Sequence, residues 1–223
     1  MHMELLKIEE VNREKGTKLL RIARRSIEHK LKRINQIENL DVNDPILDKY
    51  GIAFVTLETD VGGNYELRGC IGYIEAVAPI KEVVSRAAIA AAFSDPRFDP
   101  LSESEMDKIL IEITILTKPE PINALKREEI PSMISIGTDG LIIEKGITHA
   151  GLLLPQVPVE YCWESETFLA ETCIKAGLMP DCWLDKSVSI KRFQGLIIRE
   201  TSPGRGVEIV KPSEVKCKYL PKS

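Results

Sequence analysis

The order of helical and strand-like apolar patterns constrains the fold of this chain more than any other feature of its sequence. Apolar residues three and four apart form a helical stripe over residues 12–34, and a second stripe follows Pro79 as far as Ala92. Strand-like runs lie between and after them, at residues 52–57, 65–73 and 109–115. The two kinds of pattern do not alternate regularly, as they do in βα units, so the sequence predicts an α+β fold.

The second half of the chain carries shorter patterns of the same two kinds. A capping box at Ser102–Glu105 predicts a short helix, and Ser165 is the expected N-cap of a helix that Gly177 ends. Further strands are predicted at residues 141–143, 151–154, 188–199 and 207–210. After them, we expect residues 211–223 to form a loose tail.

Length and charge limit the classes of protein to consider. A chain of 223 residues with 43% apolar and 29% charged residues is long enough to bury a core. Its net charge is −4 with dispersed lysines and arginines, which argues against nonspecific binding of nucleic acid. Because no long apolar run and no signal-like N-terminal segment occurs, we expect a cytoplasmic protein that does not enter a membrane. Frequent Ile, Lys and Glu suit a thermophile.

The five cysteines predict neither a disulfide framework nor a metal site. Their number is odd, no Cys-x-x-Cys pair occurs, and a chain of this size does not depend on disulfides, so we expect reduced thiols. Cys162, Cys173 and Cys182 are too far apart along the chain to form a chelating turn, so no metal is expected. The glycine-containing turns match neither the P-loop nor the dinucleotide fingerprint, so no cofactor is expected.

The hexapeptide Leu67-Arg68-Gly69-Cys70-Ile71-Gly72 is the segment that most clearly suggests a functional site. On a regularly alternating strand, Arg68, Cys70 and Gly72 share one face, with Arg68 roughly 6 to 7 Å from Cys70. At that distance its charge favours a Cys70 thiolate and can hold an anionic group. The glycines leave room for a ligand or a second backbone. The alternative is that Cys70 is a small buried apolar residue and that the glycines only accommodate a bulge.

Three segments together resemble the AMMECR domain family, and their order and spacing match from about residue 7 to residue 200. The first is the hexapeptide at residues 67–72, which resembles the signature of the family. The other two are Asp95-Pro96-Arg97-Phe98 with Pro100, and Leu154-Pro155-Gln156-Val157 followed by Glu160 and Trp163. The resemblance identifies residues 7–200 as a single AMMECR-like domain.

This resemblance implies a fold, a set of partners and a site. The fold is α+β with two unequal lobes, each a mainly antiparallel sheet with helices, and with a cleft between them. Both termini contribute to the larger lobe, and the smaller lobe is inserted. In archaea and bacteria, members of the family are commonly encoded beside Memo-family and radical-SAM proteins, which are therefore candidate partners. The cysteine motif has been proposed as the active site of the family.

Two functional hypotheses follow. In the first, the protein is a cysteine-dependent enzyme that acts on a small molecule or a modified macromolecule in a cleft at Cys70. Its catalytic residues would be Cys70 and, as a proton carrier, Glu160, and its substrate-binding residues would be Arg68, Gly69, Gly72 and Arg97. In the second, the protein is a noncatalytic adaptor that binds a ligand, an RNA or another protein, and Cys70 only packs.

Three of the candidate side chains have simpler interpretations. An arginine in an Asp-x-Arg turn often ties down its own loop, which would occupy Arg97. Glu160 would be a surface carboxylate that pairs with a lysine. His149, which any Cys-His dyad would require, would be an exposed loop residue.

Overall fold

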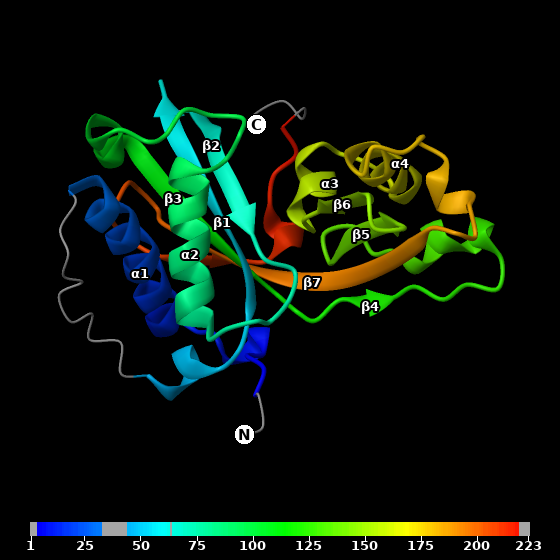
Figure 1. Ribbon diagram of the computed structural model, residues 1–223, viewed down its shortest axis with the longest axis horizontal. Coiled ribbons are helices and arrows are strands. Elements are labelled where there is room, and N and C mark those ends of the chain that lie inside the picture. Colours follow the sequence, from blue (N-terminus) through cyan, green and yellow to red (C-terminus); the bar gives the residue numbers. More distant parts are fainter. Residues whose placement is uncertain (1–3, 33–43, 63, 219–223) are drawn as a thin grey trace. The chain divides into compact units, whose positions relative to one another are not determined.

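The computed structural model describes residues 4–32, 44–62 and 64–218, and the chain forms two compact units (Figure 1). Unit 1 takes residues 1–116 and 196–210, and unit 2 takes residues 117–195 and 211–223. Each unit has a hydrophobic core of its own. Within the described residues, no helix is both long enough and apolar enough to cross a membrane.

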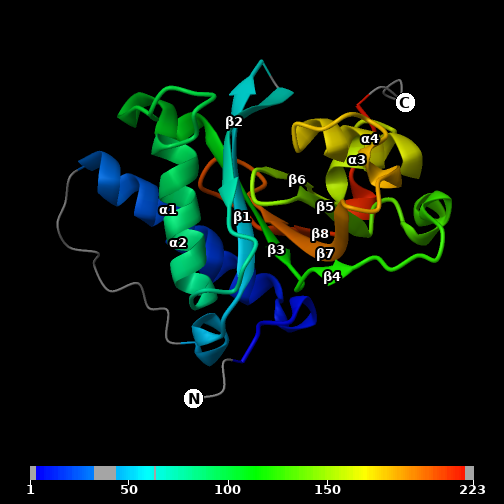
Figure 2. The same cartoon turned by 45° about the vertical axis from the view of Figure 1, so that its right-hand side comes forward.

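Unit 1 consists of two helices packed on one face of a sheet (Figure 1 and Figure 2). Its main elements are α1 (Arg13–Lys32), β1 (Ile52–Val61), β2 (Asn64–Gly72), α2 (Ile80–Phe93), β3 (Ile109–Leu116), the last residues of β7 (Ser189–Arg199) and β8 (Glu208–Val210). Short 3-10 helices lie at Ile8–Glu10, Pro45–Asp48 and Glu103–Lys108. The strand order is β2-β1-β3-β7, with β8 also paired to β7, so β2 is an edge strand.

The helical stripes of the sequence are the buried faces of α1 and α2. Buried apolar residues recur at spacings of three and four on both helices, and they include Leu20, Ala23 and Ile27 on α1 and Val84, Ala87 and Ala91 on α2. The predicted first helix is confirmed as far as Lys32, and residues 33 and 34 lie outside the described part of the chain. The capping box at Ser102 and Glu105 is also confirmed.

Unit 2 contains a second set of antiparallel strand pairs covered by helices. Its main elements are β4 (Glu120–Pro121), β5 (Asp139–Lys145), β6 (His149–Leu153), α3 (Gln156–Glu160), α4 (Ser165–Lys175) and the first residues of β7. Short 3-10 helices lie at Arg127–Met133, Cys182–Leu184 and Pro212–Glu214. The strand order is β4-β7-β5-β6. The core of the unit forms where α4 buries Phe168, Leu169 and Cys173.

The ends of α4 confirm one sequence signal and correct another. Gly177 has a φ of 75° and ends the helix as predicted, because glycine adopts this left-handed conformation without steric cost. The N-cap is Glu164 rather than Ser165. The Ser165 hydroxyl instead donates to the backbone carbonyl of Ile134, 3.4 Å away.

The expectation of reduced thiols is wrong for four of the five cysteines. Disulfides join Cys162 to Cys217 and Cys173 to Cys182. The partners are 55 and 9 residues apart, so no local spacing signals them and only the fold brings them together. Cys173 is fully buried on the apolar face of α4.

The C-terminal tail, which we expected to be loose, is held in unit 2 as far as residue 218. The disulfide from Cys217 ties it to Cys162, which follows α3. The backbone amide of Lys218 donates to the carbonyl of Glu160 at 2.8 Å, and its ammonium group lies 2.6 Å from the Glu160 carboxylate. Residues 219–223 lie outside the described part of the chain.

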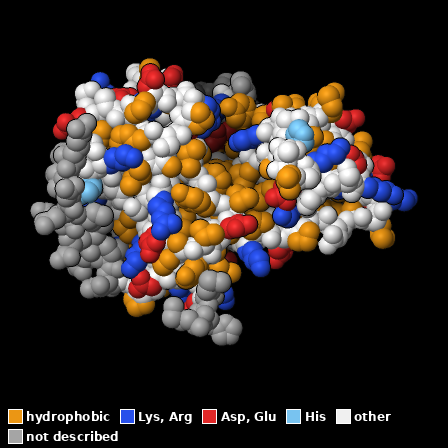
Figure 3. All heavy atoms as spheres, viewed as in Figure 1, with side chains coloured by type: hydrophobic (Ala, Val, Ile, Leu, Met, Phe, Trp, Pro, Cys, Tyr) orange, Lys and Arg blue, Asp and Glu red, His pale blue; other side chains and the backbone are white. Residues whose placement is uncertain are grey.

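The α+β class and the antiparallel sheet are confirmed. The arrangement of two lobes around a cleft and the boundaries of the domain stay predictions. Among the described atoms on the face shown in Figure 3, Lys and Arg side chains are interspersed with Asp and Glu side chains and with apolar ones. This face therefore lacks the broad basic area that nonspecific binding to nucleic acid requires.

Candidate functional site

Cys70 lies on β2, the edge strand of unit 1, and faces Thr56 on β1. The Thr56 hydroxyl donates a hydrogen bond to the Cys70 Sγ atom at 3.3 Å. Cys70 is half-buried, and among the described residues it is the cysteine that is not in a disulfide. The structure therefore leaves Cys70 partly exposed and gives its sulfur a hydrogen-bond donor, and both features favour a reactive thiol.

Asp95, which follows the end of α2, closes the outer side of β2 at this point. The backbone amide of Cys70 points away from β1 and donates to the Asp95 Oδ2 atom at 2.9 Å. The carboxylate is almost fully buried, with 2% of its side chain exposed. Hydrogen bonds from the Arg97 guanidinium, and then from the amides of Cys70 and Arg97, hold the pKa of Asp95 well below its usual range.

Arg97 links the Asp95 carboxylate to Cys70. Its Nε atom donates to Oδ1 of Asp95 at 3.0 Å and its Nη2 atom donates to Oδ2 at 2.7 Å. Nη2 also lies 3.5 Å from the carbonyl oxygen of Cys70. The Asp95 carboxylate raises the pKa of Arg97, so the guanidinium stays charged. The simpler interpretation of Arg97, that it ties down its own loop, is confirmed, while half of its side chain remains exposed to solvent.

Arg68 does not alternate regularly with Cys70, which corrects the sequence prediction. A β-bulge shifts the register between Leu57 and Glu58 of β1, and Arg68 is the extra residue on β2. Its guanidinium donates to Glu105 at 2.9 Å and to the carbonyl of Asp99 at 2.9 Å. The ion pair with Arg68 lowers the pKa of Glu105 to about 2.

The ring of Phe98 makes cation–π contacts with two arginines, Arg68 and Arg97. The Arg68 guanidinium lies 5.8 Å from the centre of the ring, and the Arg97 guanidinium lies 5.5 Å from it. Nη1 of Arg68 is buried and has no hydrogen-bond partner among the described residues. The Phe98 ring therefore contacts Arg68 of the strand that carries Cys70 as well as Arg97 of its own segment.

The two glycines of the hexapeptide have packing partners within unit 1. A side chain at Gly69 would overlap the carbonyl oxygen of Ala91 on α2, and one at Gly72 would overlap the ring of Phe54. Gly69 is therefore required because the backbones of α2 and β2 approach each other closely, and Gly72 because Phe54 of the neighbouring strand packs over it. The open space that the sequence predicted beside Cys70 is filled by protein at these two positions.

Glu160 and His149 belong to unit 2. Glu160 pairs with Lys218 in the manner that the simpler interpretation predicted. The Nδ1 atom of His149, on β6, lies 3.3 Å from the carbonyl oxygen of Ala176. The group that the structure assembles around Cys70 therefore consists of residues of unit 1.

Two members of this group were not candidates from the sequence. Thr56 lies on a strand that the sequence predicts, but only the register between β1 and β2 reveals that it contacts Cys70. The sequence is compatible with Asp95 as a helix-end or a turn residue, and its hydrogen bond from the amide of Cys70 joins residues 25 positions apart. In the described part of the chain, no three His, Cys, Asp or Glu side chains are grouped to hold a metal ion.

The chain is similar to known proteins over most of its length. The AMMECR1 family model matches residues 20–198. A protein of Saccharolobus islandicus is 58% identical over 216 residues, covering 96% of this chain and 95% of the relative. A protein of Sulfurisphaera tokodaii is 61% identical over 219 residues, with the same shares covered. These relatives come from thermophilic archaea.

A solved structure is similar over most of the chain. It is the crystal structure of an uncharacterized protein from Pyrococcus horikoshii, which is 45% identical and superposes with a TM-score of 0.85. The match covers 91% of this chain and 99% of that chain.

Proposed function

The chain belongs to the AMMECR1 family, and on that premise we propose that it is a cysteine-dependent enzyme whose nucleophile is Cys70. Its substrate would be an electrophilic small molecule or a modified macromolecule. The observation that carries the proposal is the hydrogen bond from the Thr56 hydroxyl to the Cys70 sulfur. This bond directs a donor at the atom that would carry the negative charge of a thiolate.

The charges around Cys70 support the same chemistry. A thiol attacks as the thiolate, and a hydrogen-bond donor or a nearby cation stabilises that form. Arg97 supplies the cation, and its two bonds to the buried carboxylate of Asp95 fix the position of the guanidinium. In the proposed step, the thiol first loses its proton to solvent. The thiolate sulfur then bonds to a carbonyl-type carbon of the substrate, and the electron pair of the C=O π bond moves onto the carbonyl oxygen, which leaves a tetrahedral adduct.

Asp95 and Glu160 are poor proton carriers in this proposal. Both oxygens of Asp95 accept hydrogen bonds from Arg97 or from backbone amides, and its lowered pKa keeps it ionised at neutral pH. The Glu160 carboxylate is paired with Lys218. We therefore assign Asp95 the role of positioning Arg97 and the strand, and we leave Glu160 out of the reaction.

The test is the pH dependence of Cys70 alkylation by iodoacetamide, with mass spectrometry to identify the modified cysteine. We expect Cys70 in the folded protein to react with an apparent pKa below the ordinary cysteine value of about 8.5. Thr56→Val keeps the shape of the side chain but removes the donor, so it should move this pKa back toward 8.5. A Cys70 that reacts only after unfolding, or with an unshifted pKa in both proteins, would contradict the proposal.

The second candidate function is a noncatalytic adaptor, and one specific observation favours it. Asp95 and Glu105 neutralise Arg97 and Arg68, and together they seal the edge of β2, as a purely structural cluster would. In that case Cys70 should be inert, and Cys70→Ala should leave the alkylation pattern of the native protein and its stability unchanged. The two functions thus differ in one measurable property, the reactivity of the native thiol.

A further inference from the structure

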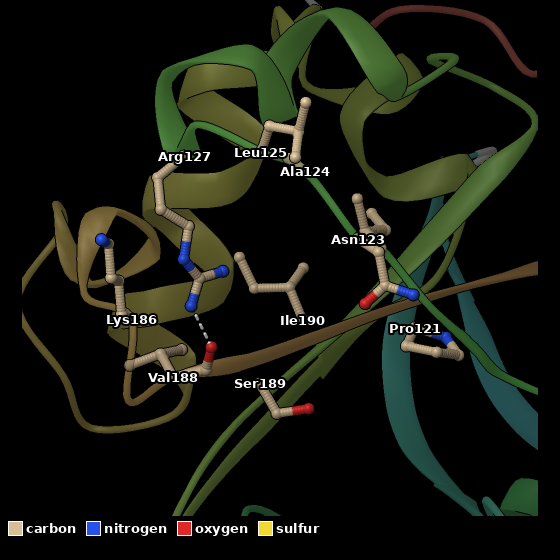
Figure 4. A pocket seen from close by; sticks show the side chains of 10 residues that line it. Pro121, Asn123, Ala124, Leu125, Arg127, Lys186, Val188, Ser189 and Ile190 are labelled. Atoms are coloured by element: carbon tan, nitrogen blue, oxygen red, sulfur yellow. Dashed lines mark hydrogen bonds between the residues drawn. The ribbon is translucent and has the colours of Figure 1, made fainter.

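A pocket of about 450 Å³ in unit 2 is lined by the start of β7 and by the chain that follows β4. This volume is in the usual range of small-molecule sites. The lining residues are Pro121, Ile122, Asn123, Ala124, Leu125, Arg127, Lys186, Val188, Ser189 and Ile190 (Figure 4). None of the ten carries a carboxylate, although the chain as a whole has a net charge of −4. The pocket is therefore a local site of positive charge.

The guanidinium of Arg127 is fixed in this pocket by the backbone. Its Nη2 atom donates to the carbonyl oxygens of Asp185, at 2.6 Å, and of Val188. Both acceptors are uncharged, so the positive charge is not neutralised by an ion pair with any described residue. Nε and Nη1 make no hydrogen bond within the described part of the chain, and they stay available to a ligand.

Three further polar side chains line the pocket without protein partners. Among the described residues, the side chains of Asn123, Lys186 and Ser189 form neither a hydrogen bond nor an ion pair. All three residues are exposed. Figure 4 shows Lys186 and Asn123 on opposite sides of the Arg127 guanidinium, with Ile190 beside it. A guanidinium, an ammonium, an amide and a hydroxyl are the donors that recognise an oxyanion.

The same pocket offers apolar surface. Ile122, Val188 and Ile190 are buried and form part of its lining, whereas Leu125 is fully exposed, at 98%. An exposed leucine beside unpaired donors can cover the apolar part of a bound molecule. The lining thus combines an anion-binding group with a short apolar wall.

We propose that this pocket binds a small organic anion, with its carboxylate or phosphate group held by Arg127 and Lys186 and a short apolar chain lying against Ile190 and Leu125. The site is independent of Cys70, which belongs to unit 1. A test of ligand binding at this pocket therefore does not depend on whether Cys70 is catalytic.

The test is isothermal titration of the full chain with acetate, hexanoate and hexanol at low ionic strength. We expect hexanoate to bind about tenfold or more tightly than acetate, because its additional methylene groups are buried. Hexanol, which lacks the charge, should not bind. No binding of hexanoate, or equal binding of acetate and hexanoate, would overturn the proposal.

A pair of lysine variants separates the pocket from general surface charge. Lys186→Ala should weaken hexanoate binding about tenfold, and because Lys186 has no partner the variant should fold normally. Lys126→Ala removes the same charge at an exposed position that does not line the pocket, and it should change the affinity less than twofold. Equal effects of the two substitutions would show a nonspecific effect of charge and would reject the site.

Discussion

The guanidinium of Arg24 and the carboxylate of Glu200 form a doubly hydrogen-bonded ion pair inside unit 1, between residues 176 positions apart in the sequence. The Nε–Oε1 distance is 2.8 Å and the Nη2–Oε2 distance is 2.6 Å. Arg24 also donates to two carbonyl groups, and Glu200 accepts from the amide of Ile111. The pair therefore joins α1, β3 and the segment after β7 in one buried network.

Neutralising one partner of this pair should strongly destabilise the protein. Glu200→Gln keeps the size of the side chain but leaves the charge of Arg24 buried without a counterion, and such losses typically cost about 3–5 kcal/mol. We expect a lower midpoint of urea unfolding, with the free energy of unfolding reduced by about that amount. Glu82→Gln is the control, because its pair with Arg86 is exposed and should contribute about 0.5 kcal/mol or less. Equal stability of the two variants would show that the buried pair is not important.

Gly69→Ala should separate β2 from α2. The added methyl group would overlap the carbonyl oxygen of Ala91, which is part of a helix backbone and has no side-chain freedom to move. We expect a loss of about 1–3 kcal/mol in the free energy of unfolding. Leu67→Ala, on the same strand at a position with 44% exposure, should change it by about 0.5 kcal/mol. A neutral Gly69→Ala would mean that β2 and α2 can move apart easily.

Acid should destabilise the protein through Asp95. The pKa of this carboxyl is lowered in the folded protein, so folding gains stability from it above its ordinary value of 3.8, and that gain is lost as the pH falls further. Asp95→Asn should be less stable than wild type by about 2 kcal/mol at pH 7, and this difference should shrink below pH 3.8. Urea unfolding at several pH values measures this difference in the free energy of unfolding. A difference that stays constant down to pH 2 would contradict the lowered pKa of Asp95.

Glu105 gives a second and higher pH window. Its pKa falls from an ordinary value of 4.5 to about 2 because of the ion pair with Arg68. The stability that this pair contributes should therefore decline from about pH 4.5 downward and disappear near pH 2. Glu105→Gln should remove this decline while leaving the one from Asp95. If the free energy of unfolding of Glu105→Gln depends on pH in the same way as that of wild type, the ion pair does not contribute to stability.

The disulfide between Cys173 and Cys182 should be present and stabilising. Alkylation of the unfolded protein without reductant should modify Cys70 alone, whereas five modified cysteines would show that both disulfides are absent. Cys182→Ala should lower the free energy of unfolding by about 2–3 kcal/mol, the value expected for a closed loop of about ten residues. Cys70→Ala, which breaks no disulfide, is the matched control for loss of a cysteine.

The sequence predicted those parts of the fold that depend on neighbours along the chain. The stripes of α1 and α2, the capping box at Ser102 and the glycine stop after α4 are all local, and all are confirmed. Arg24 follows Ala23 at the border of the apolar stripe of α1, and its charge is buried against Glu200. Periodicity shows which face of a helix is polar, but it does not show which partner lies opposite.

The candidate site was predicted only in part for the same reason. The hexapeptide directed attention to Cys70, and the Asp95–Phe98 segment supplies the arginine beside it. Regular alternation failed at Arg68, because the bulge arises from pairing with β1 and not from any local signal. The Thr56 donor and the two disulfides likewise depend on contacts between distant segments.

Strand β7 has a consequence for the order in which the chain can fold during synthesis. Its last residues pair with β3 in unit 1, but residues 117–195, which form most of unit 2, have to be synthesised between the two strands. At roughly 5–20 residues per second, β3 leaves the ribosome about 4–16 s before its neighbour exists. During those seconds the edge of a strand rich in isoleucine lacks its partner and is open to pairing with other nascent chains. A rearranged gene that places residues 196–210 directly after residue 116 would remove this delay.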